Sequence, residues 1–128
     1  DLLFEAADHL DAPAVIIGMQ GDPSRAKYDG ICSESNPQKC NGFARLNNHL
    51  REKAGAFGKP VLLIHGDTSP YCTDKGFGGK EAPLLWRFNA AGDYKVLDAV
   101  TITVNLADKN EPFAMKTLRE GLKPDPQC

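Results

Sequence analysis

Apolar residues fall into two kinds of spacing along this chain, one typical of helices and one of buried strands. In the segment LLFEAADHL they recur three and four positions apart, which predicts a helix over residues 2–10 that ends before Pro13. A second helix is predicted over residues 43–56, because apolar side chains form one stripe there and polar side chains the opposite face. Four residues make up this stripe: Phe43, Leu46, Leu50 and Ala54.

Short apolar runs rich in Val, Ile and Leu predict buried strands at residues 14–19 (AVIIGM) and 60–65 (PVLLIH). Since a helix separates them, the two strands are expected to run parallel in a βαβ unit. Residues 84–105 hold two more runs, LLWRFN and KVLDAVTITVN, which we interpret as an antiparallel set. Residues 20–41 and 70–83 are interpreted as long loops, and the chain closes in a proline-bearing tail. The predicted fold is therefore α/β, a parallel βαβ unit followed by antiparallel strands.

Length and composition set the scale of the molecule. The 128 residues, 41% hydrophobic and 25% charged, predict one domain over residues 1–128 with a core of its own. The formal net charge is -2 and the 15 Lys and Arg residues are scattered, so no surface for nucleic acid is expected. No apolar stretch approaches the ~20 residues of a membrane-spanning helix. The chain opens on Asp1 without a leader, which predicts a processed chain or a fragment.

The chain has four cysteines: Cys32, Cys40, Cys72 and Cys128. Their spacing fits no zinc-binding template, so disulfides are the favoured interpretation, and four cysteines allow three pairings. We favour Cys32 with Cys40, which would close a short polar loop, and Cys72 with Cys128. Disulfides predict an oxidising compartment, periplasmic or extracellular. The alternative is four free thiols in a cytosolic protein.

Polar residues follow directly after the strand at residues 60–65. His65 and Asp67 are two positions apart in PVLLIHGD, so their side chains point to the same side of an extended chain, where they can serve a divalent metal. The alternative is that His65 is a neutral structural histidine and that Asp67 begins a turn.

Three more residues complete a candidate pocket around His65. Gln20 and Asp22 follow the first predicted strand and would lie beside His65 if the two strands are neighbours, and Ser69 follows the second strand. Asp22 also precedes a proline, which is typical of a residue that only shapes a turn.

A His-Gly pair at a strand end also occurs in α/β-hydrolases, where it helps to build an oxyanion hole. That class needs a serine nucleophile in a G-x-S-x-G motif, and the motif is missing. Paired cysteines would offer no nucleophile either, so this class is the least favoured. The four serines lie in other contexts: Ser24, Ser33, Ser35 and Ser69.

Three segments together resemble the C-terminal half of a calcineurin-like metallophosphoesterase of a secreted bacterial type. They are APAVIIGMQGD, FARLNNHLREKAGAFGKPVLLIHGDTSPY and PLLWRFNAAGDYKVLDAVTITVN, and they cover nearly the whole chain in order and spacing. The resemblance implies part of a four-layer α/β sandwich. It also implies a centre in which Asp, His and Asn side chains at strand ends hold two metal ions, and a metal-bound hydroxide that hydrolyses phosphate esters.

The chain departs from the family pattern at the metal ligands. The N-terminal motifs Asp-x-His, Gly-Asp and Gly-Asn-His have no counterpart, and the late motif falls on GDTS, with Ser69 in place of its last histidine. The isolated family histidine falls near Met19 and Gln20. The resemblance therefore leaves Asp67 as a metal ligand, with His65 hydrogen-bonded behind it. A lone carboxylate holds an ion weakly, so Mn, Fe or Zn is expected only if another segment supplies the missing ligands.

The sequence therefore predicts a phosphoesterase-like domain that is incomplete or degenerate and inactive as an isolated chain. The alternative is a non-catalytic extracellular binding or structural module that reuses the fold. A sheet cut from a two-sheet sandwich would expose an apolar face, so we expect self-association or a companion protein that covers it.

Overall fold

The computed structural model describes residues 2–66, 70–90 and 96–128. In this part of the chain the elements follow in the order α1 (Leu2–His9), β1 (Val15–Gly18), α2 (Ala44–Phe57), β2 (Val61–His65), β3 (Cys72–Asp74), β4 (Leu85–Asn89), β5 (Val100–Val104) and β6 (Phe113–Thr117).

Four of these strands form one sheet in the order β1-β2-β4-β3. β1, β2 and β4 run parallel, whereas β3 runs antiparallel to β4 at the edge. In this register Val61 of β2 lies between Val15 of β1 and Leu85 of β4. β5 and β6 form a separate antiparallel pair. Three neighbouring parallel strands therefore end at the same edge of the sheet.

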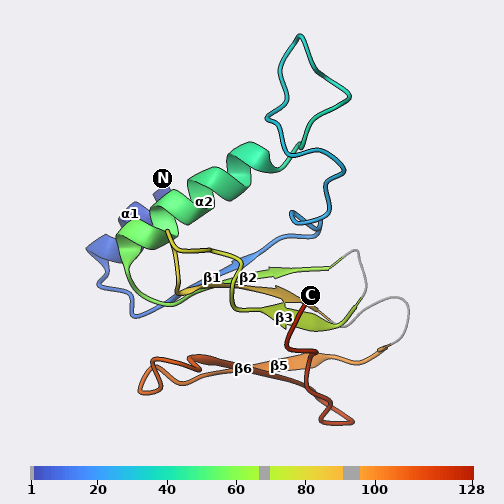
Figure 1. Ribbon diagram of the computed structural model, residues 1–128. Helices are drawn as coiled ribbons and strands as arrows, with labels where there is room; N and C mark the ends of the chain where they lie inside the picture. The colour runs from blue at the N-terminus through green and yellow to red at the C-terminus, as the bar shows by residue number, and fades with distance from the viewer. Residues whose placement is uncertain (1, 67–69, 91–95) are drawn as a thin grey trace.

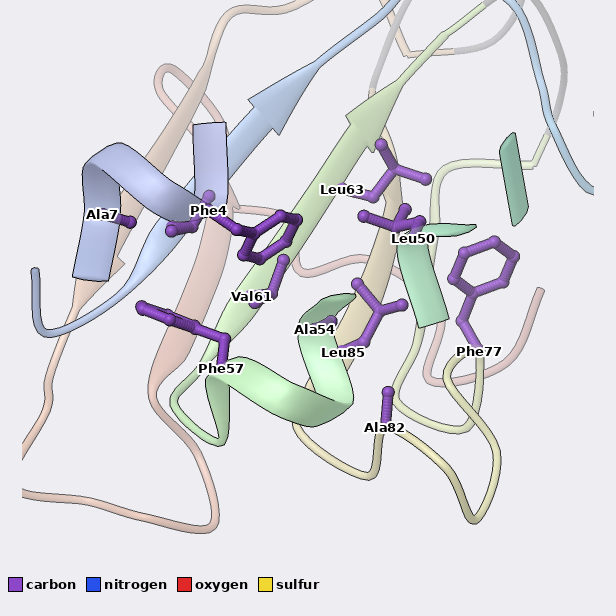
Figure 2. Close-up of a cluster of buried hydrophobic side chains, with 11 residues drawn as sticks. Phe4, Ala7, Leu50, Ala54, Phe57, Val61, Leu63, Phe77, Ala82 and Leu85 are labelled. Carbon is purple, nitrogen blue, oxygen red and sulfur yellow. The ribbon is translucent and has the colours of Figure 1, made fainter. Parts of the chain in front are cut away.

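The described elements are arranged in three layers, with the helices above the four-stranded sheet and the β5–β6 pair below it (Figure 1). The helix-side core gathers aliphatic and aromatic side chains from α1, α2 and the upper face of the sheet (Figure 2). Phe4 of α1 and Phe57 of α2 meet edge to face, with ring centroids 5.7 Å apart. The buried members of this core are Phe4, Ala7, Val15, Leu50, Ala54, Phe57, Val61, Leu63, Phe77, Ala82 and Leu85.

The β5–β6 pair covers the opposite face of the sheet with a second core. Trp86 of β4 and Phe113 of β6 meet edge to face, with ring centroids 5.8 Å apart. Leu62, Phe88 and Met115 complete the buried part of this core. Side chains of β2 and β4 therefore alternate between two apolar environments, which explains why both strands read as continuous apolar runs.

The βαβ unit was predicted correctly. α1, β1, α2 and β2 begin and end within one residue of the predicted bounds, and β1 and β2 are parallel. α2 ends as its sequence indicates, because Gly58 takes the left-handed conformation (φ 65°) and donates its N–H to the carbonyl of Ala54 at 3.2 Å.

The prediction of an antiparallel set over residues 84–105 is wrong for its first strand. β4 runs parallel to β2, and β5 pairs with β6 instead of β4. β6 lies in what we had interpreted as the tail, and the three-residue β3 lies in the predicted loop at residues 70–83. The apolar run of β4 indicates a strand that is buried on both faces, but it does not indicate the direction of that strand. β3 has only three residues, which are too few to show the alternation typical of a strand.

The expected exposed sheet face is largely covered by the β5–β6 pair. What remains is the outer edge of β1, where Ile16 is 46% exposed. The opposite edge, at β3, is covered by the C-terminal tail. Thr73 donates its N–H to the carbonyl of Asp125 at 2.8 Å, and the N–H of Asp125 donates to the carbonyl of Tyr71 at 3.0 Å.

Both disulfides pair as predicted, and they involve all four cysteines. Cys32 bonds to Cys40 within the loop before α2, and Cys72 of β3 bonds to Cys128 and holds the tail in place. Two disulfides are compatible with an oxidising, extracellular compartment.

None of the helices in the described residues is long and apolar enough to span a membrane.

Candidate functional site

The carboxyl ends of β1, β2 and β4 bring polar side chains from three separate segments to one edge of the sheet. His65 is the last residue of β2 and Asn89 the last of β4, and the two are register partners. Asp22 lies four residues beyond the end of β1, and its carboxylate approaches His65. Asn89 donates from Nδ2 to the carbonyl of Pro70 at 2.6 Å, which ties the start of the segment before β3 to this edge.

A buried arginine lies in β4, two residues before the end of the strand. Arg87 occupies the middle of β4, and its side chain points to the helix-side face and is 6% exposed. Its guanidinium nitrogen Nη1 lies 3.3 Å from Oδ1 of Asp22 and donates to Oγ of Ser24. Its other terminal nitrogen, Nη2, lies 3.7 Å from Oδ2 of Asp74 at the end of β3. We call these four residues, Asp22, Ser24, Asp74 and Arg87, the Arg87 network.

Neighbouring residues in the sequence hold the Asp22 carboxylate in the position in which it pairs with Arg87. Asp22 Oδ1 accepts hydrogen bonds from the backbone N–H of Ser24 at 2.8 Å and from its hydroxyl at 2.6 Å, the pattern of an aspartate that begins a turn. Asp22 therefore shapes the turn, as the alternative interpretation held, and is also an ion-pair partner of Arg87. The ring of Phe77 lies against the guanidinium, with its centroid 5.5 Å from Cζ.

His65 is fully buried beside this network. Its Nδ1 lies 3.2 Å from the carbonyl oxygen of Gly66, and its Nε2 lies 3.8 Å from Oδ1 of Asp22. The second distance is too long for a hydrogen bond, and Nε2 has no hydrogen-bond partner among the described residues. Burial lowers the pKa of His65, and Arg87 adds to this effect, while the Gly66 carbonyl and Asp22 oppose it. His65 is therefore a neutral imidazole at pH 7.

A polar cleft of about 430 Å³ opens next to the Arg87 network, and Ser24 and Asp74 line both. Its walls come from the loop after β1, the first half of α2 and the turn after β3. Asn47 of α2 is buried there and donates to the carbonyl of Pro23 at 2.8 Å. Arg51 donates from Nε to the carbonyl of Phe77 at 3.2 Å. The remaining lining residues are Asp29, Asn41, Ala44, Asn48 and Gly76.

The structure brings two of the predicted site residues together, His65 and Asp22. Gln20 has an exposed side chain and contributes its carbonyl, which accepts the N–H of Gly66 at 3.1 Å. Asp67 and Ser69 lie outside the described residues.

The sequence interpretation missed Ser24, Asp74, Arg87 and Asn89. A charged residue inside the buried run LLWRFN was the available signal, because an arginine in a strand buried on both faces needs an anionic partner. The sequence pattern did not indicate which carboxylates would pair with this arginine.

The described residues do not fit a two-metal centre. Among them, no three His, Cys, Asp or Glu side chains are grouped so as to hold a metal ion. The carboxylate of Asp22, which faces His65, is already paired with the Arg87 guanidinium. The fold and the site define a mixed α/β domain with an internally neutralised polar cluster at the carboxyl ends of its parallel strands.

No family model, curated protein or solved structure matches this chain.

Proposed function

We propose that the chain is the C-terminal portion of a calcineurin-like phosphoesterase domain whose metal centre is incomplete, so that it hydrolyses no phosphate ester by itself. One observation supports this proposal: Asp22 from the loop after β1, His65 at the end of β2 and Asn89 at the end of β4 lie at one edge of the sheet. This is the edge at which α/β proteins place their ligands.

The chemistry explains why the chain is inactive alone. A two-metal phosphoesterase activates water on its ions and needs several carboxylate and imidazole ligands to hold them. In this chain the carboxylate of Asp22 is engaged by Arg87. Hydrolysis therefore requires ligands from a companion segment that carries the missing Asp-x-His and Gly-Asn-His motifs.

Metal content and hydrolysis together test the proposal. The oxidised chain, purified without chelator, should contain no stoichiometric pair of Mn, Fe or Zn by mass spectrometry. It should not hydrolyse bis(p-nitrophenyl) phosphate in the presence of MnCl2. A stoichiometric metal pair in the isolated chain would contradict the incompleteness.

Co-expression with a segment that carries the missing motifs should restore hydrolysis. The variant His65→Ala should lower this restored rate, whereas His9→Ala, on the exposed surface of α1, should not. A complex that forms and still fails to hydrolyse phosphate esters would contradict the phosphoesterase assignment.

The polar cleft favours a second candidate, a non-catalytic extracellular binding module. Its lining offers amide, hydroxyl and carboxylate groups beside a site in which the charges are already paired. Ligand binding without turnover, lost on substitution of Asn48 in the cleft wall, would support this candidate. The α/β-hydrolase alternative gains no support from Ser24, because its hydroxyl donates to Asp22 and not to His65.

A further inference from the structure

One carboxylate of the Arg87 network, that of Asp22, is buried and needs a counter-charge, whereas that of Asp74 is 34% exposed. The side chain of Asp22 is only 8% exposed, and burial of an isolated carboxylate costs several kcal/mol unless a cation or several donors compensate it. Asp74 approaches the same point from β3, an element far from Asp22 in the sequence. Two anionic side chains from different elements thus converge on one buried position.

The guanidinium of Arg87 occupies that position. Its two terminal nitrogens face different carboxylates, at 3.3 Å from Asp22 and 3.7 Å from Asp74, and Nη1 also donates to Ser24. The ring of Phe77 lies against the guanidinium. A planar, permanently charged group with several donors can bridge two carboxylates in this way without a solvent shell.

A second, independent observation concerns His65. Its Nε2 is buried, lacks a hydrogen-bond partner among the described residues and lies 3.8 Å from Oδ1 of Asp22. A neutral imidazole nitrogen beside a carboxylate is the donor set that Mn, Fe and Zn prefer. Within the described part of the chain, Nε2 of His65 is therefore free to act as a metal ligand, whereas the neighbouring Asp22 carboxylate is paired with Arg87.

We infer that Arg87 is the resident cation of this site: its guanidinium supplies to the buried Asp22 carboxylate the positive charge that a divalent metal would supply, and it keeps such a metal away from the pair Asp22 and His65. The inference deepens the proposed function and rests on it only for the identity of the excluded ligand. It makes Arg87 the residue that determines whether the pair Asp22 and His65 is open to a divalent ion.

Replacement of Arg87 by an uncharged residue of similar length tests the inference. Arg87→Met leaves the buried Asp22 carboxylate without its cation, so the melting temperature should fall by roughly 10 °C or more. MnCl2 should recover part of that loss with a saturable dependence on concentration. Wild-type protein should keep the same melting temperature with MnCl2 or with EDTA. Binding of Mn²⁺, followed by its electron paramagnetic resonance signal, should be at least about tenfold tighter to Arg87→Met than to wild type.

Two matched variants separate charge from packing. Arg87→Lys keeps the positive charge and should show no stabilisation by MnCl2. The double variant Asp22→Asn with Arg87→Met removes both charges, so it should melt above Arg87→Met alone and should not respond to MnCl2. If Arg87→Met does not fold without metal, refolding in MnCl2 and the double variant still report the effect.

The inference is overturned if wild-type protein binds Mn²⁺ as tightly as Arg87→Met, or if Arg87→Met gains neither binding nor stability from MnCl2. These results do not depend on hydrolysis. Failure of the phosphoesterase proposal would instead show as a companion complex that does not turn over phosphate esters, whatever the metal response of the Arg87 variants.

Discussion

The buried imidazole of His65 links the stability of the domain to pH. Burial lowers the pKa of His65 below its ordinary value of 6.5, so the folded protein keeps the ring neutral at a pH where the unfolded chain takes up a proton. The contribution of His65 to the free energy of unfolding should therefore be constant above about pH 7.5 and should fall as the pH drops below 6.5, by at most about 1.4 kcal/mol per pH unit. Urea denaturation at a series of pH values measures this fall.

The variant His65→Gln should lose part of this pH dependence, because it removes the group that titrates. His9→Gln is the control, since it removes an exposed histidine of α1 and leaves the buried cluster unchanged. Equal slopes of stability against pH for wild type and His65→Gln would contradict the prediction.

At the residue scale the sequence predicted two residues of the site and missed four. His65 and Asp22 were predicted as neighbours because both follow strands of one βαβ unit, and the structure places them 3.8 Å apart. Arg87 was missed because its partners depend on how β4 is inserted beside β2 and on where the loop after β1 returns. Such contacts join residues 65 positions apart, and local pattern carries no information about them.

Among the elements, α2 packs closely against the turn before β4 at Gly55. A Cβ at this position would overlap the backbone carbonyl of Glu81 in the turn before β4. Helix propensity alone predicts that Gly55→Ala stabilises the protein by about 1 kcal/mol. Because the overlap is with backbone, we expect the opposite sign, a loss of roughly 1–3 kcal/mol in urea denaturation.

Gly18→Ala, at the end of β1, provides the control for this prediction. A Cβ there has no heavy atom within 4 Å, so its effect should stay within about 0.5 kcal/mol. A stabilised Gly55→Ala variant would show that the turn at Glu81 moves away from α2 at little cost.

Prediction succeeded for elements that have a period and failed for those defined by their partners. α2 has fourteen residues with apolar side chains at helical spacing, and β2 is a continuous apolar run, so both elements could be recognised from local sequence. The predicted stripe of α2 is wrong in one detail, because Leu46 is exposed and Asn47 is buried in its place. β3 has three residues and exists because it pairs with β4 and the tail. The direction of β4 follows from the crossover that connects it to β2, which no local pattern encodes.

For the molecule as a whole, the two disulfides should contribute unequally. Cys72–Cys128 joins residues 56 apart and holds the tail along β3, whereas Cys32–Cys40 joins residues 8 apart in an exposed loop. The chain-entropy model gives about 4 kcal/mol for the longer loop and about 2.5 kcal/mol for the shorter one. The double variant Cys72→Ala with Cys128→Ala should therefore lower the melting temperature by roughly 10–20 °C.

The matched double variant Cys32→Ala with Cys40→Ala should cost clearly less, because little of that loop is buried. Limited proteolysis should cut the freed tail only in the Cys72/Cys128 variant. Equal melting temperatures for the two double variants would argue against the role of the tail in closing the sheet.

Self-association remains a prediction, and the structure suggests the edge strand β1 as the surface through which two copies would pair. The outer edge of β1 has the sequence VIIG, with no charge or proline to discourage pairing, and Ile16 is exposed there. We expect light scattering to give about twice the monomer mass of 13.9 kDa, through pairing of β1 with β1 of a second copy.

Ile16→Lys should return the mass to that of the monomer, whereas Leu46→Lys, on the exposed side of α2, should not. A wild-type chain that stays monomeric at high concentration would remove the proposed pairing and leave a companion protein as the candidate for that edge.

The single tryptophan makes the two faces of the sheet optically distinguishable. Trp86 of β4 lies in the core between the four-stranded sheet and the β5–β6 pair, against Phe113 and with the ammonium of Lys75 4.7 Å from its ring centroid. The helices α1 and α2 lie on the opposite face of the sheet. Indole fluorescence therefore reports on the docking of the β5–β6 pair, and the circular dichroism of the helices reports on the upper layer. Because the same strands separate the two chromophores, any lag between the two signals during refolding would reveal which face of the sheet is covered first.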